Sequence, residues 1–370
     1  MANNPPGQAV LGMSTQLDIL ALEPFFGGAR KAMLETIMRH SRHRWTLLKL
    51  PPRRIERRLA VAAHWFAEQL TRHWKGRLDV LFTSEAMNLQ DLTRFVPELR
   101  KKPTVVYFHD NQLPEVGQSA ELPHHLANLT TANVATEIWF NSLYHLRTFL
   151  RRASSLVELH PELSSRSPMQ DLTNKAQLMP PPVDLTLSKD VIGYEIIPRD
   201  PRMLFVDTRD ADVKTLNEAL LKLHRRGEKY RLVTVGPVEG LDDELPRNTI
   251  SESDEVAQIR ALHESNILLS ARPTAASDHH AVRGLHIGCW PVFPNSGVYP
   301  ELLPASLHGR CLYDGSHPDR LVAQLQNVWW MDRPMDLADQ LKDILQQFDA
   351  IQACQMMDER LEQMAIAHSI

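Results

Sequence analysis

The chain has few cysteines and no long apolar segment, and these two absences exclude several classes of protein. Only three of its 370 residues are cysteine, widely spaced and without a Cys-x-x-Cys pair, so neither a disulfide framework nor a cysteine-based zinc site is expected. No run approaches the roughly 18 consecutive apolar residues of a membrane helix. Residues 1–15 lack the basic flank and apolar stretch of a signal peptide, and we expect them to form a short flexible leader. The sequence therefore predicts a cytoplasmic protein without a membrane span.

Motifs of several enzyme classes are also missing. The sequence has no phosphate-binding P-loop and no recognisable Ser-His-Asp arrangement. His279 and His280 are adjacent, so they point in different directions on a helix, and no second pair of ligands stands at metal spacing. We therefore expect neither a bound metal nor a cofactor.

Positive charge is concentrated in the first part of the chain. Residues 1–102 carry 17 Lys and Arg against 9 Asp and Glu, whereas the whole chain has a net charge of −4. The densest run contains Arg53, Arg54, Arg57 and Arg58 and opens a predicted helix. Such a run either contacts an anionic partner such as the phosphates of a nucleic acid, or simply solvates one face of the helix.

Short apolar runs alternate with longer amphipathic segments, a pattern typical of parallel βαβ units. We expect strands at 17–22, 45–50, 78–83, 104–108, 137–141, 176–179, 203–206, 230–235, 267–269, 290–293 and 311–313. We expect helices from Gly28 to about His40 and at 58–73, 142–152, 212–226, 255–264, 279–287, 318–329 and 337–367. The alternation is interrupted at 153–200, which is rich in proline and serine and includes the triple proline at 180–182.

This interruption divides the chain into two α/β domains. We expect a Rossmann-like domain at 16–185 and a second at 186–370, which would include the terminal helices. Ligands of open α/β sheets bind beyond the carboxyl ends of the strands. Two such sheets facing each other would bind their ligands in a central cleft.

Gly27 and Gly28 directly follow the first predicted strand. Two glycines allow a positive φ and a close backbone approach to a ligand, and the start of the next helix favours an anion. Arg30 and Lys31 add positive charge there. The alternative is that the glycines serve only the geometry of a strand-to-helix turn.

His109, Asp110, Asn111 and Gln112 are four consecutive polar residues after the strand at 104–108. Side chains of these types can donate or accept hydrogen bonds to a sugar hydroxyl or a phosphate. A hydrogen-bonded turn is the alternative interpretation.

Arg209 and Lys214 follow the first strand of the second domain. Two cations near the start of a helix would grip a diphosphate, because Arg binds oxygens bidentately and Lys adds a point charge. Pairing of these cations with the nearby Asp207, Asp210 and Asp212 is the alternative.

Several segments resemble one known family. They are EPFFGGARK (23–31), SEAMNLQDL (84–92), YFHDNQLP (107–114), FNSLYHLRTFL (140–150) and VYPELLP (298–304). In order and over most of the chain, they resemble the tRNA-queuosine α-mannosyltransferases, which are glycosyltransferase family 4-like enzymes with the GT-B fold. The resemblance implies metal-independent transfer of mannose from GDP-mannose to queuosine in tRNA, with retention of configuration. The C-terminal lobe would hold most of the nucleotide sugar, and the N-terminal lobe most of the acceptor.

The resemblance also assigns roles to individual residues. The catalytic set would be His109, Arg209 and Lys214, and the two cations would also bind the donor with Gly27, Gly28 and Glu301. On the acceptor side the resemblance matches Lys31 and Gln112. From the residues themselves we also expect Asp110, Asn111 and the basic run Arg53, Arg54, Arg57 and Arg58 there.

The chain departs from the family at two positions. The family's Glu-x7-Glu pair falls on Ala275 and Arg283, so both carboxylates are missing and a ribose contact would come from elsewhere, with Asp278 as a candidate. Two alternatives therefore stay open, a binding protein that has lost turnover and a glycosyltransferase with a non-tRNA acceptor. The sequence leaves the sugar, the nucleotide and the oligomeric state open.

Overall fold

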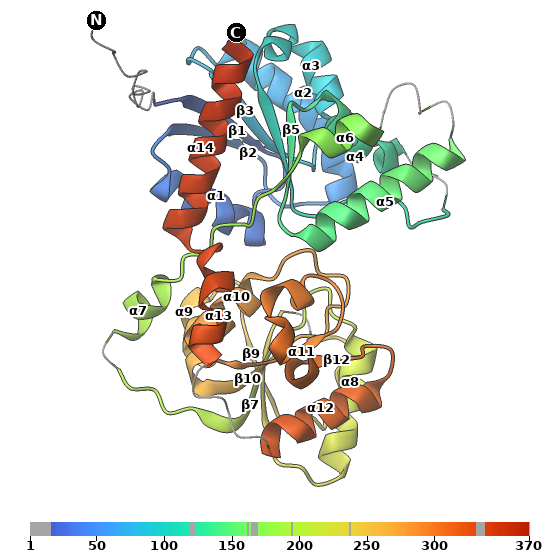
Figure 1. Cartoon of the computed structure of the whole chain (residues 1–370), viewed down its shortest axis with the longest axis vertical. Coiled ribbons are helices and arrows are strands. Elements are labelled where there is room, and N and C mark those ends of the chain that lie inside the picture. The colour runs from blue at the N-terminus through green and yellow to red at the C-terminus, as the bar shows by residue number, and fades with distance from the viewer. Residues whose placement is uncertain are drawn as a thin grey trace, which may run out of the picture.

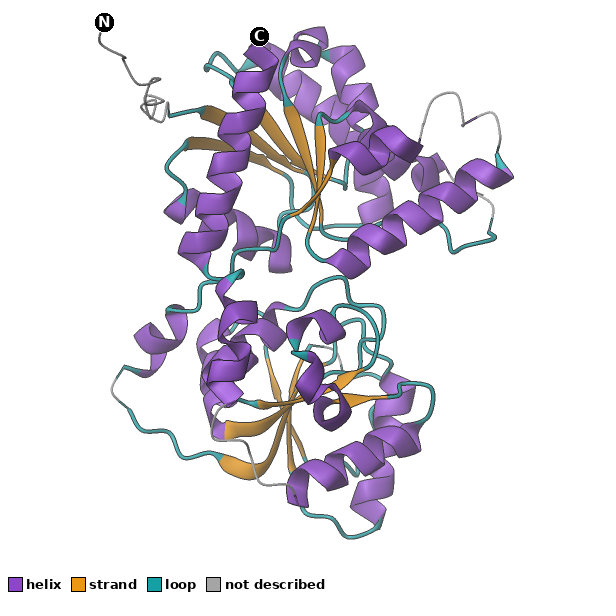
Figure 2. Ribbon diagram, viewed as in Figure 1, coloured by secondary structure: helices purple, strands orange, loops and turns teal. Residues whose placement is uncertain are grey.

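A computed structural model describes residues 16–118, 123–160, 163, 169–193, 195–236, 238–330 and 337–369. The expected leader at 1–15 lies outside the described residues. The described chain folds into two α/β lobes, each built around one twisted sheet with helices on both faces (Figures 1 and 2).

The N-terminal lobe contains a six-stranded sheet in the order β2-β1-β3-β4-β5-β6, with every pair of neighbours parallel. Its strands are β1 (Asp18–Glu23), β2 (Arg44–Lys49), β3 (Val80–Ser84), β4 (Thr104–Phe108), β5 (Glu137–Phe140) and β6 (Ala176–Leu178). Its helices are α1 (Gly28–His40), α2 (Ile55–Arg72), α3 (Leu89–Phe95), the 3-10 helix η1 (Pro97–Lys101), α4 (Pro123–Val134), α5 (Leu143–Leu159) and α6 (Met169–Lys175).

The C-terminal lobe contains a second parallel sheet of six strands, in the order β12-β11-β10-β7-β8-β9. Its strands are β7 (Asp200–Asp207), β8 (Arg231–Val235), β9 (Arg247–Ile250), β10 (Ser265–Leu269), β11 (Trp290–Pro294) and β12 (Leu312–Tyr313). Its helices are α7 (Leu187–Ile192), α8 (Val213–Arg225), α9 (Glu255–Glu264), α10 (His279–Ile287), the 3-10 helix η3 (Tyr299–Leu302), α11 (Ala305–Cys311), α12 (Pro318–Trp330) and α13 (Leu337–Gln346). The prediction of two Rossmann-like domains is therefore confirmed.

Strand β4 illustrates why these strands are apolar throughout. Val105 and Tyr107 pack into the core on one face of the sheet, whereas Val106 and Phe108 pack into the core on the other. All four side chains are fully buried. Burying a side chain of this size contributes about 1.5–3 kcal/mol, so a strand covered on both faces favours a continuous apolar run.

The last helix, α14 (Ala350–Ser369), lies against the N-terminal lobe, beside α1 (Figure 1). Its residues Cys354, Met357 and Leu361 belong to the same core as Ile19 of β1. Just before α14 the chain crosses back from the C-terminal lobe to the N-terminal lobe. At this crossing the N–H of Val183 donates to the carbonyl of Phe348 at 2.8 Å. The domain predicted at 186–370 includes α14, whereas in the structure this helix packs on the N-terminal lobe. The single helix expected at 337–367 is divided into α13 and α14 by this crossing.

The strand orders determine where a ligand can enter. The connections reverse direction between β1 and β3 in the first sheet and between β7 and β10 in the second. A crevice opens beyond the carboxyl ends of the strands at such switch points. Both crevices face the gap between the lobes.

Candidate active site between the lobes

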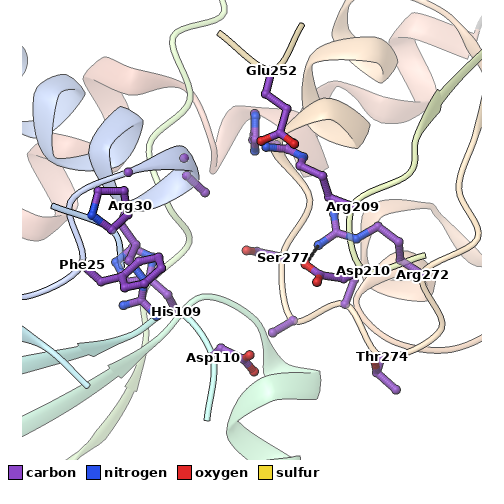
Figure 3. Close-up of a pocket in the computed structure, with 17 residues that line it drawn as sticks. Phe25, Arg30, His109, Asp110, Arg209, Asp210, Glu252, Arg272, Thr274 and Ser277 are labelled. Carbon is purple, nitrogen blue, oxygen red and sulfur yellow. Dashed lines mark ion pairs between the residues drawn. The ribbon is translucent and has the colours of Figure 1, made fainter. Parts of the chain in front are cut away.

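A cavity of about 500 Å³ lies between the two lobes, and we call it the interlobe cavity. Its walls come from loops at the carboxyl ends of strands in both sheets. The N-terminal lobe contributes residues after β1 and β4, and the C-terminal lobe contributes residues after β7 and β10 (Figure 3). The cavity therefore joins the two switch points.

The glycine turn at Gly27 and Gly28 forms one wall of the cavity. Gly28 has a φ of +52°, and a Cβ atom on Gly27 would lie 2.5 Å from Cγ of Pro52. Both positions therefore favour glycine, for conformation at one and for space at the other. Helix α1 begins here without a side-chain cap or an acidic residue in its first turn, so its free N–H groups favour an anion.

Glu85, at the end of β3, organises the N-terminal wall. Its buried carboxylate accepts hydrogen bonds from both terminal nitrogens of Arg30 and from the backbone N–H groups of His109 and Asp110, the last two at 3.2 and 3.1 Å. Burial raises the pKa of the neighbouring Glu23 to about 7, against the opposing effect of Arg30. Glu85 belongs to the family-like segment at 84–92. No local pattern in this segment predicts its contacts with α1 and with the loop after β4.

The polar loop after β4 divides into two pairs. His109 and Asp110 line the interlobe cavity, whereas Asn111 and Gln112 are outside its lining. Asn111 accepts a hydrogen bond from Arg152, and the N–H of Gln112 donates to Asn128 at 2.6 Å.

The surroundings of the His109 imidazole favour its neutral form. Burial holds its pKa well below the ordinary range, and the positive charge of Arg30 and the neighbouring His145 act in the same direction. Its Nε2 atom is buried without a hydrogen-bond partner among the described residues. A neutral ring nitrogen at the cavity wall can exchange one hydrogen bond with a ligand hydroxyl.

Arg209 lies at the cavity wall of the C-terminal lobe and is held by Asp207. Its Nε and Nη2 atoms donate to the two carboxylate oxygens at 2.9 and 2.6 Å. Asp207 also contacts Nδ1 of His280 at 3.0 Å. Although burial opposes ionisation, the hydrogen bonds from Arg209 and His280 hold the pKa of Asp207 well below its usual range.

The second cation of this wall is Arg272, which follows β10, and not the predicted Lys214. The Arg272 guanidinium lies 3.6 Å from Asp278 and 3.9 Å from Asp207. Its Nε atom is buried without a partner among the described residues. Lys214 is exposed on α8 and does not line the cavity. The arginine could not be selected from spacing, because the β10–α10 loop brings it to Arg209 from 63 positions along the chain.

Glu301 lies at a different place from the one expected. Its carboxylate accepts hydrogen bonds from the N–H groups of Leu143 and Tyr144, at the start of α5 in the other lobe. It is not among the residues that line the cavity. Glu301 therefore caps a helix across the lobe boundary in this structure, and its role in donor binding stays a prediction.

The remaining predicted residues lie near the cavity mouth or away from it. Lys31 is exposed and pairs with Glu35 of the same helix at 3.8 Å. Arg53, Arg54 and Arg57 are exposed in the loop and first turn that follow Pro52, a cavity residue. Arg58 donates to the carbonyl of Pro51 and so anchors this loop, which we call the basic loop (residues 51–58).

Comparisons with known proteins agree with the two-lobed architecture. The family described as tRNA-queuosine alpha-mannosyltransferase N-terminal matches residues 18–183. The tRNA-queuosine alpha-mannosyltransferase of Drosophila melanogaster is 23% identical over 310 residues, which cover 77% of this chain and 81% of the relative. The chain is therefore similar to this family, by a domain match in its N-terminal lobe and by a distant match over most of its length.

Solved structures show the same GT-B fold. The N-terminal domain of Candida albicans trehalose-6-phosphate phosphatase matches with a TM-score of 0.68 at 9% identity, covering 98% of this chain and 99% of that one. Anabaena Alr3699/HepE, solved with UDP and glucose, matches with a TM-score of 0.60 at 13% identity, covering 94% of this chain and 100% of that one. At these identities the likeness concerns the fold.

The two positions at which the resemblance places a Glu-x7-Glu pair hold Ala275 and Arg283. Ala275 lines the cavity, and Arg283 forms an ion pair with Glu255 at 2.7 Å. Asp278 caps α10 through the N–H of Ala281 and accepts the hydroxyl of Tyr299, so it is already engaged.

Two features are absent from the part of the chain that the structure describes. No helix in this part is long and apolar enough to span a membrane. Nor does it contain a group of three or more His, Cys, Asp or Glu side chains that could hold a metal ion.

Proposed function

We propose that this protein is a retaining glycosyltransferase that transfers mannose from GDP-mannose to queuosine in tRNA. The similarity to the tRNA-queuosine alpha-mannosyltransferases supports the reaction class. The structural observation that carries the proposal is the interlobe cavity, where Arg209 and Arg272 of one lobe face the glycine turn and His109 of the other (Figure 3).

In the proposed mechanism, the cations act on the leaving group. Breaking the glycosidic bond leaves the nucleoside diphosphate with additional negative charge. Arg209 and Arg272 would stabilise this charge from the C-terminal lobe, and the N-terminus of α1 from the other side. The two guanidinium groups are held by carboxylates before the donor binds, so their positions need little reorganisation.

The N-terminal lobe would bind the acceptor. His109 would bond a hydroxyl through Nε2, and Asp110 would contact the acceptor base, while Asn111 and Gln112 hold the loop. The basic loop, with Arg53, Arg54 and Arg57, would contact tRNA phosphates beside the cavity mouth. Lys31 and Arg58 would add charge at the same edge of the lobe.

A second candidate function is a binding protein without turnover. The absence of carboxylates at Ala275 and Arg283, where the resemblance places a Glu-x7-Glu pair, favours it. Such a protein would bind GDP or the donor, but it would leave the tRNA unchanged.

Mass spectrometry of tRNA nucleosides distinguishes the two functions. Cells that express the protein should contain a hexosyl-queuosine that disappears when the gene is deleted and returns with the wild-type chain. Identical nucleosides in both cell types, together with GDP binding by the purified protein, would support the binding protein instead.

A further inference from the structure

Some charged side chains of the interlobe cavity form ion pairs within the protein, and others do not. Arg30 is neutralised by Glu85, and Arg209 by Asp207, as described above. Among the residues that the structure describes, the cavity carboxylates Asp110 and Glu252 make no ion pair, whereas Asp210 lies 3.9 Å from Arg272. Each lobe therefore presents to the cavity one carboxylate without an ion-pair partner among the described residues.

Asp110 is the carboxylate of the acceptor side that lacks such a partner. Its N–H is fixed by Glu85, and its Oδ1 accepts the N–H of Asn111 at 2.8 Å. In Figure 3 its side chain lies in the gap between the lobes, next to the loop that carries His109. Although Asp110 is exposed at the cavity, partial desolvation raises its pKa. The hydrogen bond from Asn111 and the charges of Arg30 and Arg152 oppose this effect, and Glu85 reinforces it. A bound cation would provide this carboxylate with an ion-pair partner.

We infer that the Asp110 carboxylate binds the protonated secondary amine of queuosine and so selects this base over guanine, an inference that rests on the function proposed above. In queuosine, a secondary amine joins the deazaguanine to a cyclopentenediol. Alkyl amines of this kind are protonated at neutral pH, whereas an unmodified guanosine carries no cation at that position.

The geometry of the loop supports this assignment. His109 and Asp110 are consecutive, and a single carboxylate, Glu85, binds both of their N–H groups, so the spacing between the two side chains is fixed. The amine of queuosine is attached directly to the diol ring. An ammonium group on Asp110 would therefore place the diol close to His109, where the mannosyl group has to arrive. Charged pairs of this kind contribute mainly to specificity and orientation.

Steady-state kinetics with the full-length protein tests the inference. The acceptors are queuosine-containing tRNA and two chemically modified forms, one N-methylated at the amine, which stays cationic, and one N-acetylated, which is neutral. The wild-type enzyme should accept the methylated form at least tenfold better than the acetylated form. Asp110→Asn should raise KM for queuosine tRNA at least tenfold, abolish this preference and leave KM for GDP-mannose within twofold.

Two further variants test whether Asp110→Asn acts only by disturbing the structure. Asp110→Glu keeps the charge and should retain the preference for the methylated acceptor, and the exposed Asp190→Asn on α7 should match the wild type. A wild-type KM in Asp110→Asn, or an unchanged preference, would overturn the inference and leave the proposed function standing. Absence of any transfer by the wild-type chain would instead overturn the proposed function, and this inference with it.

Discussion

The carboxylate of Glu301 in the C-terminal lobe accepts a hydrogen bond from the N–H of Leu143 in the N-terminal lobe, at 2.9 Å. Beside it, the hydroxyl of Ser142 donates to the carbonyl of Ala276 at 2.6 Å. A negative charge from one lobe thus meets the positive end of α5 in the other. This contact helps to hold the lobes in the arrangement that forms the interlobe cavity.

Removing the Glu301 carboxylate should loosen this arrangement. Glu301→Ala leaves two N–H groups at the start of α5 uncapped, which costs about 1–2 kcal/mol. We expect a lower melting temperature in calorimetry and a larger radius of gyration in small-angle scattering. Glu98→Ala, at an exposed carboxylate on η1, is the control. A variant with wild-type stability and dimensions would show that Glu301 does not join the lobes.

The cation that partners Arg209 can be identified by measuring nucleotide affinity. We expect Arg272→Ala to weaken GDP binding at least tenfold in titration calorimetry, because its guanidinium lies at the cavity wall. Lys214→Ala should change the affinity less than twofold, because this side chain is exposed outside the lining. The opposite ranking would favour the pair predicted from sequence and would remove Arg272 from the donor site.

The burial of His145 makes the free energy of unfolding depend on pH. Burial, with the charges of Arg152 and Arg30, lowers the pKa of His145 to about 3. In the unfolded chain His145 binds a proton below about pH 6.5. In the folded protein the same imidazole stays neutral until about pH 3. The residue's contribution to the free energy of unfolding therefore falls as pH drops through this window, by up to about 1.4 kcal/mol per unit.

Chemical denaturation at pH 5 and pH 7 measures this effect. His145→Asn should lose less stability between the two values than the wild type does, since asparagine does not titrate. The exposed His73→Asn should behave as the wild type. An equal loss in wild type and His145→Asn would mean that His145 is protonated in the folded protein.

The basic loop should govern the salt dependence of tRNA binding. Combined replacement of Arg53, Arg54 and Arg57 by alanine should weaken binding. It should also reduce the slope of log K against log salt by about one for each phosphate that these side chains neutralise in the wild type. A matched triple variant on the C-terminal lobe, with alanine at Arg225, Arg320 and Lys342, should keep the wild-type slope. Equal slopes in both variants would identify the basic loop as an ordinary solvated surface.

Local patterns predicted most of the fold, and tertiary contacts account for the differences. The strand at 104–108 has the predicted bounds because it is a continuous apolar run. The helices at 255–264 and 279–287 also have the predicted bounds, because an aspartate caps the start of each. Strand β9 was missed, since its sequence RNTI sits half-exposed at the sheet edge and lacks an apolar run. The break between α13 and α14 was missed as well, because it depends on the pairing of Phe348 with a segment 165 residues earlier in the chain.

For the candidate site, the sequence placed the right loops but not every side chain. Five predicted residues line the cavity: Gly27, Gly28, His109, Asp110 and Arg209. They could be predicted because polar or glycine-rich loops that follow apolar strands are recognisable in the sequence. The roles of Glu85, Arg272 and Glu301 depend on contacts between distant loops or between lobes. Such contacts leave no periodic signal in the sequence.

Sugar transfer by the purified protein is the decisive measurement for the proposed function. GDP-mannose and queuosine-containing tRNA are incubated with the wild-type chain or with His109→Ala, and the digested nucleosides are analysed by mass spectrometry. We expect the wild type to add one hexose to queuosine and release GDP, and His109→Ala to bind GDP normally but to transfer at least a hundredfold more slowly. Unmodified queuosine after incubation with the wild type, despite measurable GDP binding, would show that the interlobe cavity binds the nucleotide without transferring the sugar.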